Sequence, residues 1–191
     1  MKTVIIDNYD SFTYNLVHYI EEINDERPIV LRNDKFELND LEKFDIIVLS
    51  PGPGLPKDAG LLMDVIERYH KTKVILGVCL GHQALGEFFG SKLKNLSQVY
   101  HGVDCELDKL SDVVIYGDSD TVTVGRYHSW VVDPVNFSSK LEITSIDSDG
   151  EIMSLKHKTL PIHGVQYHPE SVLTPEGKQL LRNFFNHYKQ K

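Results

Sequence analysis

The chain has 191 residues, which suits one continuous domain, residues 1–191, with a full-sized core. Its 28 acidic residues outnumber its 20 lysines and arginines, and the net charge of −8 argues against a nucleic-acid partner. No apolar run reaches the roughly 20 residues of a membrane span, and no basic N-terminal segment with a following apolar run indicates secretion.

Strand and helix patterns alternate through the first half of the chain. Runs of apolar residues predict four strands: Thr3–Asp7, Ile29–Arg32, Ile46–Leu49 and Val74–Val78. Apolar residues at helical spacing predict helices over 12–23, 61–69 and 83–89, the first of them capped by Asp10 or Ser11. This alternation predicts an α/β fold with a doubly wound, mostly parallel sheet of the flavodoxin-like type. Ligands are expected at the carboxyl ends of its strands.

The pattern changes in the second half of the chain. From Asp112 to Val165, short apolar runs separated by turns predict an antiparallel extension of the sheet. A last helix is expected to start at Thr174 and Pro175, because its apolar residues then recur at helical spacing as far as Tyr188.

The segment around Cys79 carries the strongest chemical signal. Cys79 follows the apolar strand 74–78 directly, with Gly77 two residues before it and Gly81 two residues after it. A small residue at each of these places, between a strand and a helix, is the pattern of a nucleophile elbow, here with Cys in the Ser place. The helix N-terminus behind the turn favours the thiolate. We interpret Cys79 as a nucleophile rather than a structural core cysteine.

A base for this nucleophile is expected far downstream, in His168-Pro169-Glu170. Pro169 favours an extended conformation for His168, and residues two apart in an extended stretch point to the same side. Glu170 can then orient the His168 imidazole and stabilise its charged form. By itself this tripeptide also fits a simple turn with a solvated glutamate, and only its pairing with the elbow favours catalysis.

Ser50-Pro51-Gly52-Pro53-Gly54 follows another predicted strand. Its glycines leave backbone N–H groups accessible, and the N–H of Leu80 at the elbow can supply a second donor. Two such donors form an oxyanion hole, in which each is worth about 3 kcal/mol. An ordinary strand-to-helix loop has the same composition, so this motif is weak alone.

Together these motifs, in this order and at this spacing, resemble the class I (triad) glutamine amidotransferases over essentially the whole chain. The opening segment 7–13, Asp-Asn-Tyr-Asp-Ser-Phe-Thr, is similar to the small subunits of anthranilate synthase and aminodeoxychorismate synthase, as is His128-Ser129. The resemblance implies hydrolysis of L-glutamine without a cofactor in this chain. It also implies delivery of ammonia to a large chorismate-binding synthase subunit.

The resemblance assigns roles by position. Cys79 is the nucleophile, His168 the base and Glu170 the group that orients it. The glutamine and oxyanion site is assigned to Gly52, Gly54, Leu80, Gln83, Ser129 and Trp130, with Gln83 acting through its amide and Ser129 and Trp130 through their backbone. Two residues depart from the family pattern. Trp130 stands where Leu is frequent and is expected to narrow or cover the pocket, and Val103 replaces a frequent Lys.

Three functions remain open from the sequence. The first is an amidotransferase subunit serving a separate synthase of the anthranilate type, with the aminodeoxychorismate type as its alternative. The second is a stand-alone cysteine γ-glutamyl hydrolase, and the third is a non-enzymatic binding module. The intact Cys79, His168 and Glu170 disfavour the third, and the segment 7–13 favours the first over the second.

The remaining cysteine and histidine patterns indicate neither a metal nor a disulfide. Cys79 and Cys105 lack metal or redox spacing, which favours a reducing, cytoplasmic setting. His163 and His168 lie five residues apart without an H-E-x-x-H pattern, and Pro169 is incompatible with a helix there. Tyr9 and Phe12 fit either the core or a partner surface.

Overall fold

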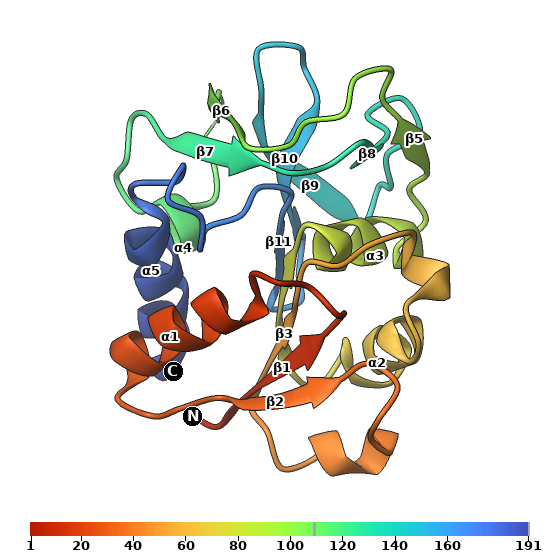
Figure 1. The fold of residues 1–191 in the computed structure, drawn as a ribbon, viewed down its shortest axis with the longest axis vertical. Coiled ribbons are helices and arrows are strands. Elements are labelled where there is room, and N and C mark those ends of the chain that lie inside the picture. The colour runs from red at the N-terminus through yellow and green to blue at the C-terminus, as the bar shows by residue number, and fades with distance from the viewer. Residues whose placement is uncertain (109, 191) are drawn as a thin grey trace.

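The computed structural model describes residues 1–108 and 110–190. Helices and loops surround a central seven-stranded sheet (Figure 1). The strand order is β2-β1-β3-β4-β11-β10-β9. The five strands from β2 to β11 in this order pair in parallel, and β10 and β9 continue the sheet antiparallel. The bounds are β1 Thr3–Asp7, β2 Ile29–Arg32, β3 Ile46–Leu49, β4 Val74–Val78, β9 Leu141–Ile146, β10 Ile152–His157 and β11 Ile162–Val165.

The predicted α/β fold with a mostly parallel sheet is confirmed, and the first four strands have the predicted bounds. The physical reason is burial on both faces of the sheet. All residues of β1 and β3 are buried, and successive side chains alternate between two cores. Ile5 belongs to one core cluster, whereas its neighbours Val4 and Ile6 belong to the other.

Helices cover both faces of the sheet. Helices α1 (Thr13–Asn24), α4 (Val113–Tyr116) and α5 (Gly177–Lys189) pack on one face, where Leu16, Ile115 and Phe184 share one core cluster. Helices α2 (Leu62–Tyr69) and α3 (Leu80–Phe88) pack on the other face. The short 3-10 turns η1 (Leu38–Leu41) and η2 (Pro56–Asp58) precede β3 and α2, respectively. No helix in residues 1–108 and 110–190 is long and apolar enough to cross a membrane.

The ends of three helices differ from the prediction. Neither Asp10 nor Ser11 caps α1, which begins at Thr13 after Phe12; the Asp10 carboxylate instead accepts from the Phe12 N–H before the helix. Helix α3 begins at Leu80, immediately after Cys79, three residues earlier than predicted. Helix α5 begins at Gly177, because the hydroxyl of Thr174 donates to the His168 carbonyl and holds that segment outside the helix.

The predicted antiparallel extension is correct for β9 and β10 only. Residues 113–116 form the helical turn α4, which the Asp112 side chain caps by accepting from the Val114 N–H at 3.1 Å. Two further antiparallel pairs lie outside the main sheet: β5 (Leu93–Asn95) with β8 (Trp130–Val132), and β6 (Val103–Glu106) with β7 (Thr123–Arg126). Each of these strands has only three or four residues, too few for its pattern to stand out in the sequence.

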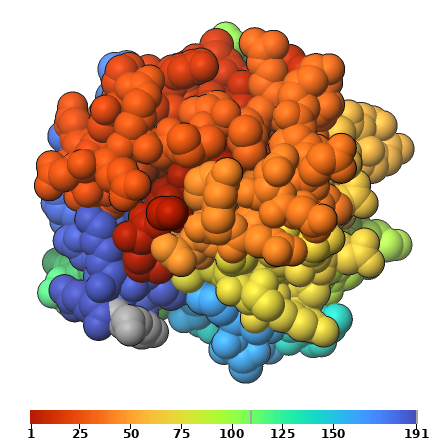
Figure 2. Space-filling view, turned by 90° about the horizontal axis from the view of Figure 1, so that it is seen from below, coloured from red at the N-terminus to blue at the C-terminus, as the bar shows by residue number. Residues whose placement is uncertain are grey.

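The two ends of the molecule are built differently. Figure 2 views it from below, at the face turned away from β7 and β8 in Figure 1. Segments coloured red to yellow, from the N-terminus to α2, cover most of this face, and α5 lies in blue beside them. The carboxyl ends of β3 and β4 point the other way, where the residues that follow them share a cavity with the start of β8.

His82 on α3 is fully buried, with its ring against Gly164 of β11. Burial lowers the pKa of His82 to about 4 from its ordinary 6.5, and the nearby Gly164 backbone offsets this only in part. Between these two pH values the unfolded chain binds a proton that the folded chain does not. The contribution of His82 to stability is therefore present above pH 6.5 and is lost as the pH falls toward 4.

The variant His82→Gln, which carries no charge at any pH, should be less sensitive to acid. The fall in the free energy of unfolding between pH 7 and pH 4.5 should be smaller by about 2 kcal/mol than in the parent. Urea titrations at both pH values measure this, with His18→Gln on the exposed side of α1 as control. The same pH dependence in parent and His82→Gln would contradict the buried, neutral state of His82.

Candidate active site

Cys79 occupies a strained turn between β4 and α3. Its backbone has φ 50° and ψ −99°, a combination that a non-glycine residue adopts only where surrounding structure enforces it. The glycines on either side allow the close approach that the sequence predicted. A Cβ on Gly77 would lie 2.5 Å from the Gly81 carbonyl carbon, and a Cβ on Gly81 would lie 2.4 Å from the Leu49 carbonyl oxygen.

The elbow is tied to the neighbouring strand. The Cys79 N–H donates to the Val165 carbonyl at 2.8 Å, and this bond extends the parallel pairing of β4 with β11. The chain that leaves β11 therefore passes directly beside the thiol. Residues 166–170, far away in the sequence, are brought to Cys79 in this way.

His168 and Glu170 form a buried pair. Their side chains are 2% and 0% exposed, and the His168 Nδ1 lies 2.7 Å from the Glu170 Oε1. The expected extended stretch is wrong: the Ser171 N–H donates to the His168 carbonyl at 3.1 Å, so the two side chains meet across a turn. The Gly125 carbonyl, which accepts from the His168 N–H, and the Thr174 hydroxyl hold this turn in place.

The remaining ring nitrogen of His168, Nε2, is buried and has no hydrogen-bond partner among the described residues. Burial by itself lowers the pKa of His168, but the Cys79 and Glu170 side chains beside it raise this pKa well above its ordinary value. Phe12 and Tyr127 flank the imidazole at ring-centroid distances of 5.4 and 4.9 Å. The pair of His168 and Glu170 is thus held rigidly and can carry a proton near Cys79.

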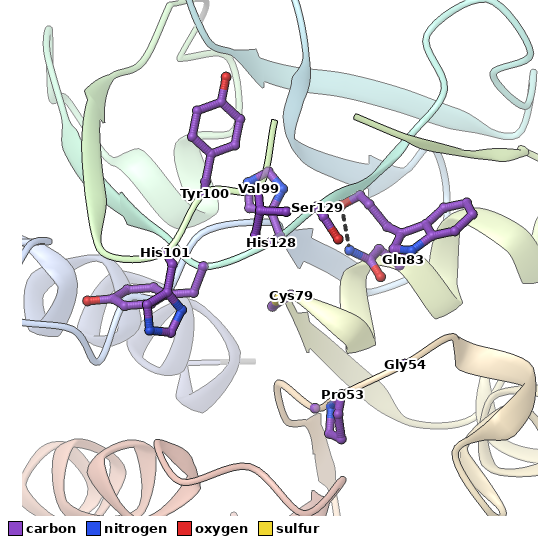
Figure 3. A pocket seen from close by; sticks show the side chains of 12 residues that line it. Pro53, Gly54, Cys79, Gln83, Val99, Tyr100, His101, His128 and Ser129 are labelled. Carbon is purple, nitrogen blue, oxygen red and sulfur yellow. Dashed lines mark hydrogen bonds between the residues drawn. The ribbon is translucent and has the colours of Figure 1, made fainter. Parts of the chain in front are cut away.

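Cys79 lies at the base of a cavity of about 270 Å³ (Figure 3). Five of the six predicted substrate residues line it: Gly52, Gly54, Gln83, Ser129 and Trp130. The sixth, Leu80, has a side chain buried in the core, and its contribution is confined to the backbone N–H at the start of α3. The segment Val99-Tyr100-His101, which was not expected from the sequence, lines the side of the cavity opposite the loop with Gly54.

Hydrogen bonds from Asn8 to Ser50 hold the loop that carries Gly52 and Gly54. The Asn8 N–H donates to the Ser50 hydroxyl at 2.8 Å, and its side-chain amide donates to the Ser50 carbonyl at 2.9 Å. A Cβ on Gly52 would lie 2.5 Å from the Asn8 Cβ and 2.8 Å from the Leu80 side chain. Gly52 therefore packs directly against the elbow, whereas Gly54, at φ +76°, faces open space.

The opposite wall of the cavity is already hydrogen-bonded. The Gln83 Nε2 donates to the Trp130 carbonyl at 2.8 Å and to the Gln166 Oε1 at 3.2 Å, while the Ser129 carbonyl accepts from the Leu96 N–H. Both hydrogens of the Gln83 amide are thus used within the protein, and its amide oxygen remains to meet a ligand. The first of these bonds is dashed in Figure 3.

Two residues to which the sequence analysis assigned no role belong to the site. Gln166 is fully buried, and its Nε2 donates to the Cys79 Sγ at 3.5 Å. His128 lines the cavity, and burial together with the nearby Arg126 lowers the pKa of His128 to about 3. The signal for Gln166 was its place just before the His-Pro-Glu tripeptide, but only the pairing of β11 with β4 puts it beside the thiol.

The family model described as "Glutamine amidotransferase class-I" matches residues 4–188. The chain belongs to the class I glutamine amidotransferases. The resemblance inferred from the motifs is therefore confirmed.

Curated relatives of this amidotransferase support the narrower resemblance. The chain is 45% identical to anthranilate synthase component 2 of Pseudomonas aeruginosa, covering 95% of this chain and 93% of that one. It is 39% identical to aminodeoxychorismate/anthranilate synthase component 2 of Bacillus subtilis, covering 98% and 97%. It is also 44% identical to the bifunctional protein TrpGD of Thermotoga maritima, covering 97% of this chain but 32% of that longer one.

A solved structure agrees on the fold alone. A glutamine amidotransferase from Thermotoga maritima superposes with a TM-score of 0.81 at 15% identity, covering 100% of this chain and 99% of that one.

The two departures from the family pattern occupy different places in the amidotransferase. Trp130, at the start of β8, lies between the Cys79 cavity and a neighbouring hollow, and it lines both. It therefore forms part of the cavity wall, and its expected narrowing of the pocket stays a prediction. Val103, at the start of β6, pairs with Arg126 and is 39% exposed, outside the residues that line the cavity.

The close packing of the elbow predicts a specific loss of stability. Gly81→Ala should reduce the free energy of unfolding by about 2–3 kcal/mol, because the new methyl group meets the backbone of β3 and cannot be accommodated by a side-chain rotation. Gly150→Ala is the control, since a Cβ there has nothing within 4 Å and costs only the strain of φ +80°, about 1 kcal/mol. Urea denaturation compares them, and equal losses would contradict the steric account.

Proposed function

We propose that this chain is the glutaminase subunit of an anthranilate synthase, with the equivalent subunit of aminodeoxychorismate synthase as the alternative. It hydrolyses L-glutamine and passes ammonia to a large, chorismate-using synthase subunit. One observation carries the proposal: a cysteine at a strained elbow faces a cavity and lies beside a buried histidine that is paired with a glutamate at 2.7 Å. The Pseudomonas relative, an anthranilate synthase component 2, supports the first pathway, and the Bacillus relative, named for both enzymes, supports keeping the alternative.

The proposed reaction uses only groups of this chain and no cofactor. The Cys79 thiolate attacks the side-chain carbonyl carbon of glutamine, and the resulting oxyanion accepts from the Leu80 N–H and from an N–H of the loop with Gly52 and Gly54. His168 then gives its Nε2 proton to the leaving nitrogen, the C–N bond breaks, and ammonia leaves a glutamyl thioester behind.

The second half of the reaction restores the enzyme. His168 takes a proton from water as the water oxygen attacks the thioester carbon, and collapse of this intermediate releases glutamate and the Cys79 thiolate. Glu170 accepts from the His168 Nδ1–H throughout, so Nε2 faces the reacting atoms in both steps. Each cycle consumes one glutamine and one water.

The division of labour predicts a selective loss. In the complex with the large subunit, Cys79→Ser should lower glutamine-dependent synthesis by about 10³-fold or more and leave synthesis from added ammonia unchanged. The matched control is Cys105→Ser on β6, because burial raises the pKa of that thiol to about 11 and keeps it unreactive. Synthesis is followed by product fluorescence or chromatography.

The outcomes separate the candidate functions. Loss of the ammonia-dependent reaction as well would contradict the proposed role of Cys79. A chain that purifies without a large subunit and, alone and at full rate, hydrolyses γ-glutamyl peptides to glutamate and the free amino acid or peptide would instead be a stand-alone hydrolase. The product formed from chorismate with the co-purified large subunit, anthranilate or aminodeoxychorismate, decides between the two enzymes.

The histidine and the glutamate should contribute unequally to catalysis. His168→Ala should reduce kcat for glutamine hydrolysis by roughly 10⁴-fold, since it removes the proton carrier, whereas Glu170→Ala should cost about a hundredfold less. The double variant should resemble His168→Ala, because Glu170 acts only through His168. Steady-state ammonia release measures all three, and losses that multiply independently would show that the residues do not act as a unit.

A further inference from the structure

A continuous chain of hydrogen bonds runs from the cavity wall to the Cys79 sulfur. It begins at the Trp130 carbonyl, which accepts from the Gln83 Nε2 at 2.8 Å. The same nitrogen donates to the Gln166 Oε1 at 3.2 Å, and the Gln166 Nε2 donates to the Cys79 Sγ at 3.5 Å. Gln83 and Trp130 line the cavity, whereas Gln166 is fully buried behind its wall.

The start of this chain fixes its direction. A backbone carbonyl can only accept, so the Gln83 amide must turn its NH₂ group toward Trp130. The second hydrogen of that group then points at Gln166, which must present its oxygen. The Gln166 amide is left with only one orientation, in which an N–H and not a carbonyl oxygen faces the sulfur. Flipping either amide would place two acceptors or two donors against each other.

The last bond of the chain gains most when the sulfur is charged. A thiol is a weak acceptor. A buried amide N–H that faces a thiol therefore gains less hydrogen-bond energy than one that faces a stronger acceptor. A thiolate is a charged acceptor and makes a stronger bond with the same N–H. Placing an amide donor here therefore favours the reactive form of Cys79.

We propose that Gln166 is a positioning residue that orients the Cys79 sulfur and stabilises its thiolate, and that Gln83 and Trp130 set the orientation of Gln166 from the substrate cavity. This deepens the proposed function and rests on Cys79 as the nucleophile. A glutamine molecule in the cavity meets Gln83 and Trp130 directly, so its contacts act on the same chain that ends at the thiol.

The experiment measures the reactivity of Cys79 without substrate. In a Cys105→Ser background, the rate of alkylation by iodoacetamide is followed against pH by mass spectrometry. Gln166→Met keeps the length of the side chain and removes the donor, and it should raise the midpoint of the alkylation profile by about one pH unit. The matched control is Gln179→Met on α5, a glutamine whose side chain bonds Asn183 and Arg182 at the surface and whose replacement should leave the midpoint unchanged.

Other titratable groups are common to all variants and cancel in the comparison. The titratable groups around the thiol line the two hollows that Cys79 borders, except Glu170, which contacts His168. They are Tyr9, Asp10, Tyr100, His101, Tyr127, His128, His168 and Glu170. His82, behind the elbow, is neutral at the pH values at which a thiol titrates, because burial lowers the pKa of His82 to about 4. A change of midpoint between Gln166→Met and the parent therefore reports on the lost donor.

A second readout separates positioning from a purely structural role. In the complex, Gln166→Met should lower kcat for glutamine hydrolysis about tenfold with KM within twofold, because Gln166 does not touch the cavity. A variant that melts earlier but keeps the parental alkylation midpoint would overturn the proposal. Should Gln166→Met fail to fold, Gln83→Met tests the same chain from its other end: it should also raise the midpoint, and an unchanged midpoint again overturns the proposal.

The two proposals fail in distinguishable ways. If the midpoint rises but the complex releases no ammonia from glutamine, the coupling of Gln166 to Cys79 stands and the proposed function falls. If the complex is a glutaminase that loses activity with Cys79→Ser, yet the midpoint in Gln166→Met equals that of the parent, the function stands and the role of Gln166 falls.

Discussion

The parallel pairing of β4 with β11 is the contact on which the candidate site depends. Gly77 lies opposite Gly164 in this pair, and Val78 opposite Val165. The Cys79 N–H continues the pairing by one bond, so the elbow and the chain after β11 leave the sheet side by side. Glycine at these positions lets α3 lie close to both strands, since a Cβ on Gly164 would come within 2.9 Å of the His82 ring.

The electrostatics of the site follow from what each buried histidine meets there. Burial alone favours the neutral imidazole, and it lowers the pKa of His82 to about 4 and, with the help of Arg126, that of His128 to about 3. His168 is buried as well, yet its pKa is raised, because the Cys79 and Glu170 side chains stabilise its charged form. Among these three, only the histidine with a carboxylate beside it holds a proton in the interior.

The N-terminal segment after β1, two strands away from β4 in the sheet, also contributes to this arrangement. Asn8, directly after β1, holds the loop with Gly52, and Phe12 packs against both His168 and Tyr127. The sequence left Tyr9 and Phe12 open between core and surface, and the structure places them differently. Phe12 contacts the His168 ring, whereas Tyr9 is 48% exposed and donates to Asp34 at the surface. Both line a second hollow that reaches Cys79.

The sequence by itself determined the elements whose causes are local. Apolar runs mark β1, β3 and β4 because both faces of a parallel sheet are buried, and the glycines around Cys79 mark a turn that tolerates no side chain there. Cys79 at a helix start, and His168 two residues before Glu170, were therefore accessible without a structure. The helix ends were less accurate, because Thr174 and the residues around Asp10 take their hydrogen bonds from other parts of the fold.

Only the tertiary structure decided what depends on contacts between distant segments. The place of β11 beside β4, and with it the meeting of Cys79 and His168, comes from pairing across 80 residues and more that no local pattern encodes. The short strands of the pairs β5·β8 and β6·β7 become strands only because each finds a partner. Gln166 is a polar residue without a motif of its own. Its position against the thiol exists because the Gln83 amide, fixed by a backbone carbonyl of β8, leaves it one orientation.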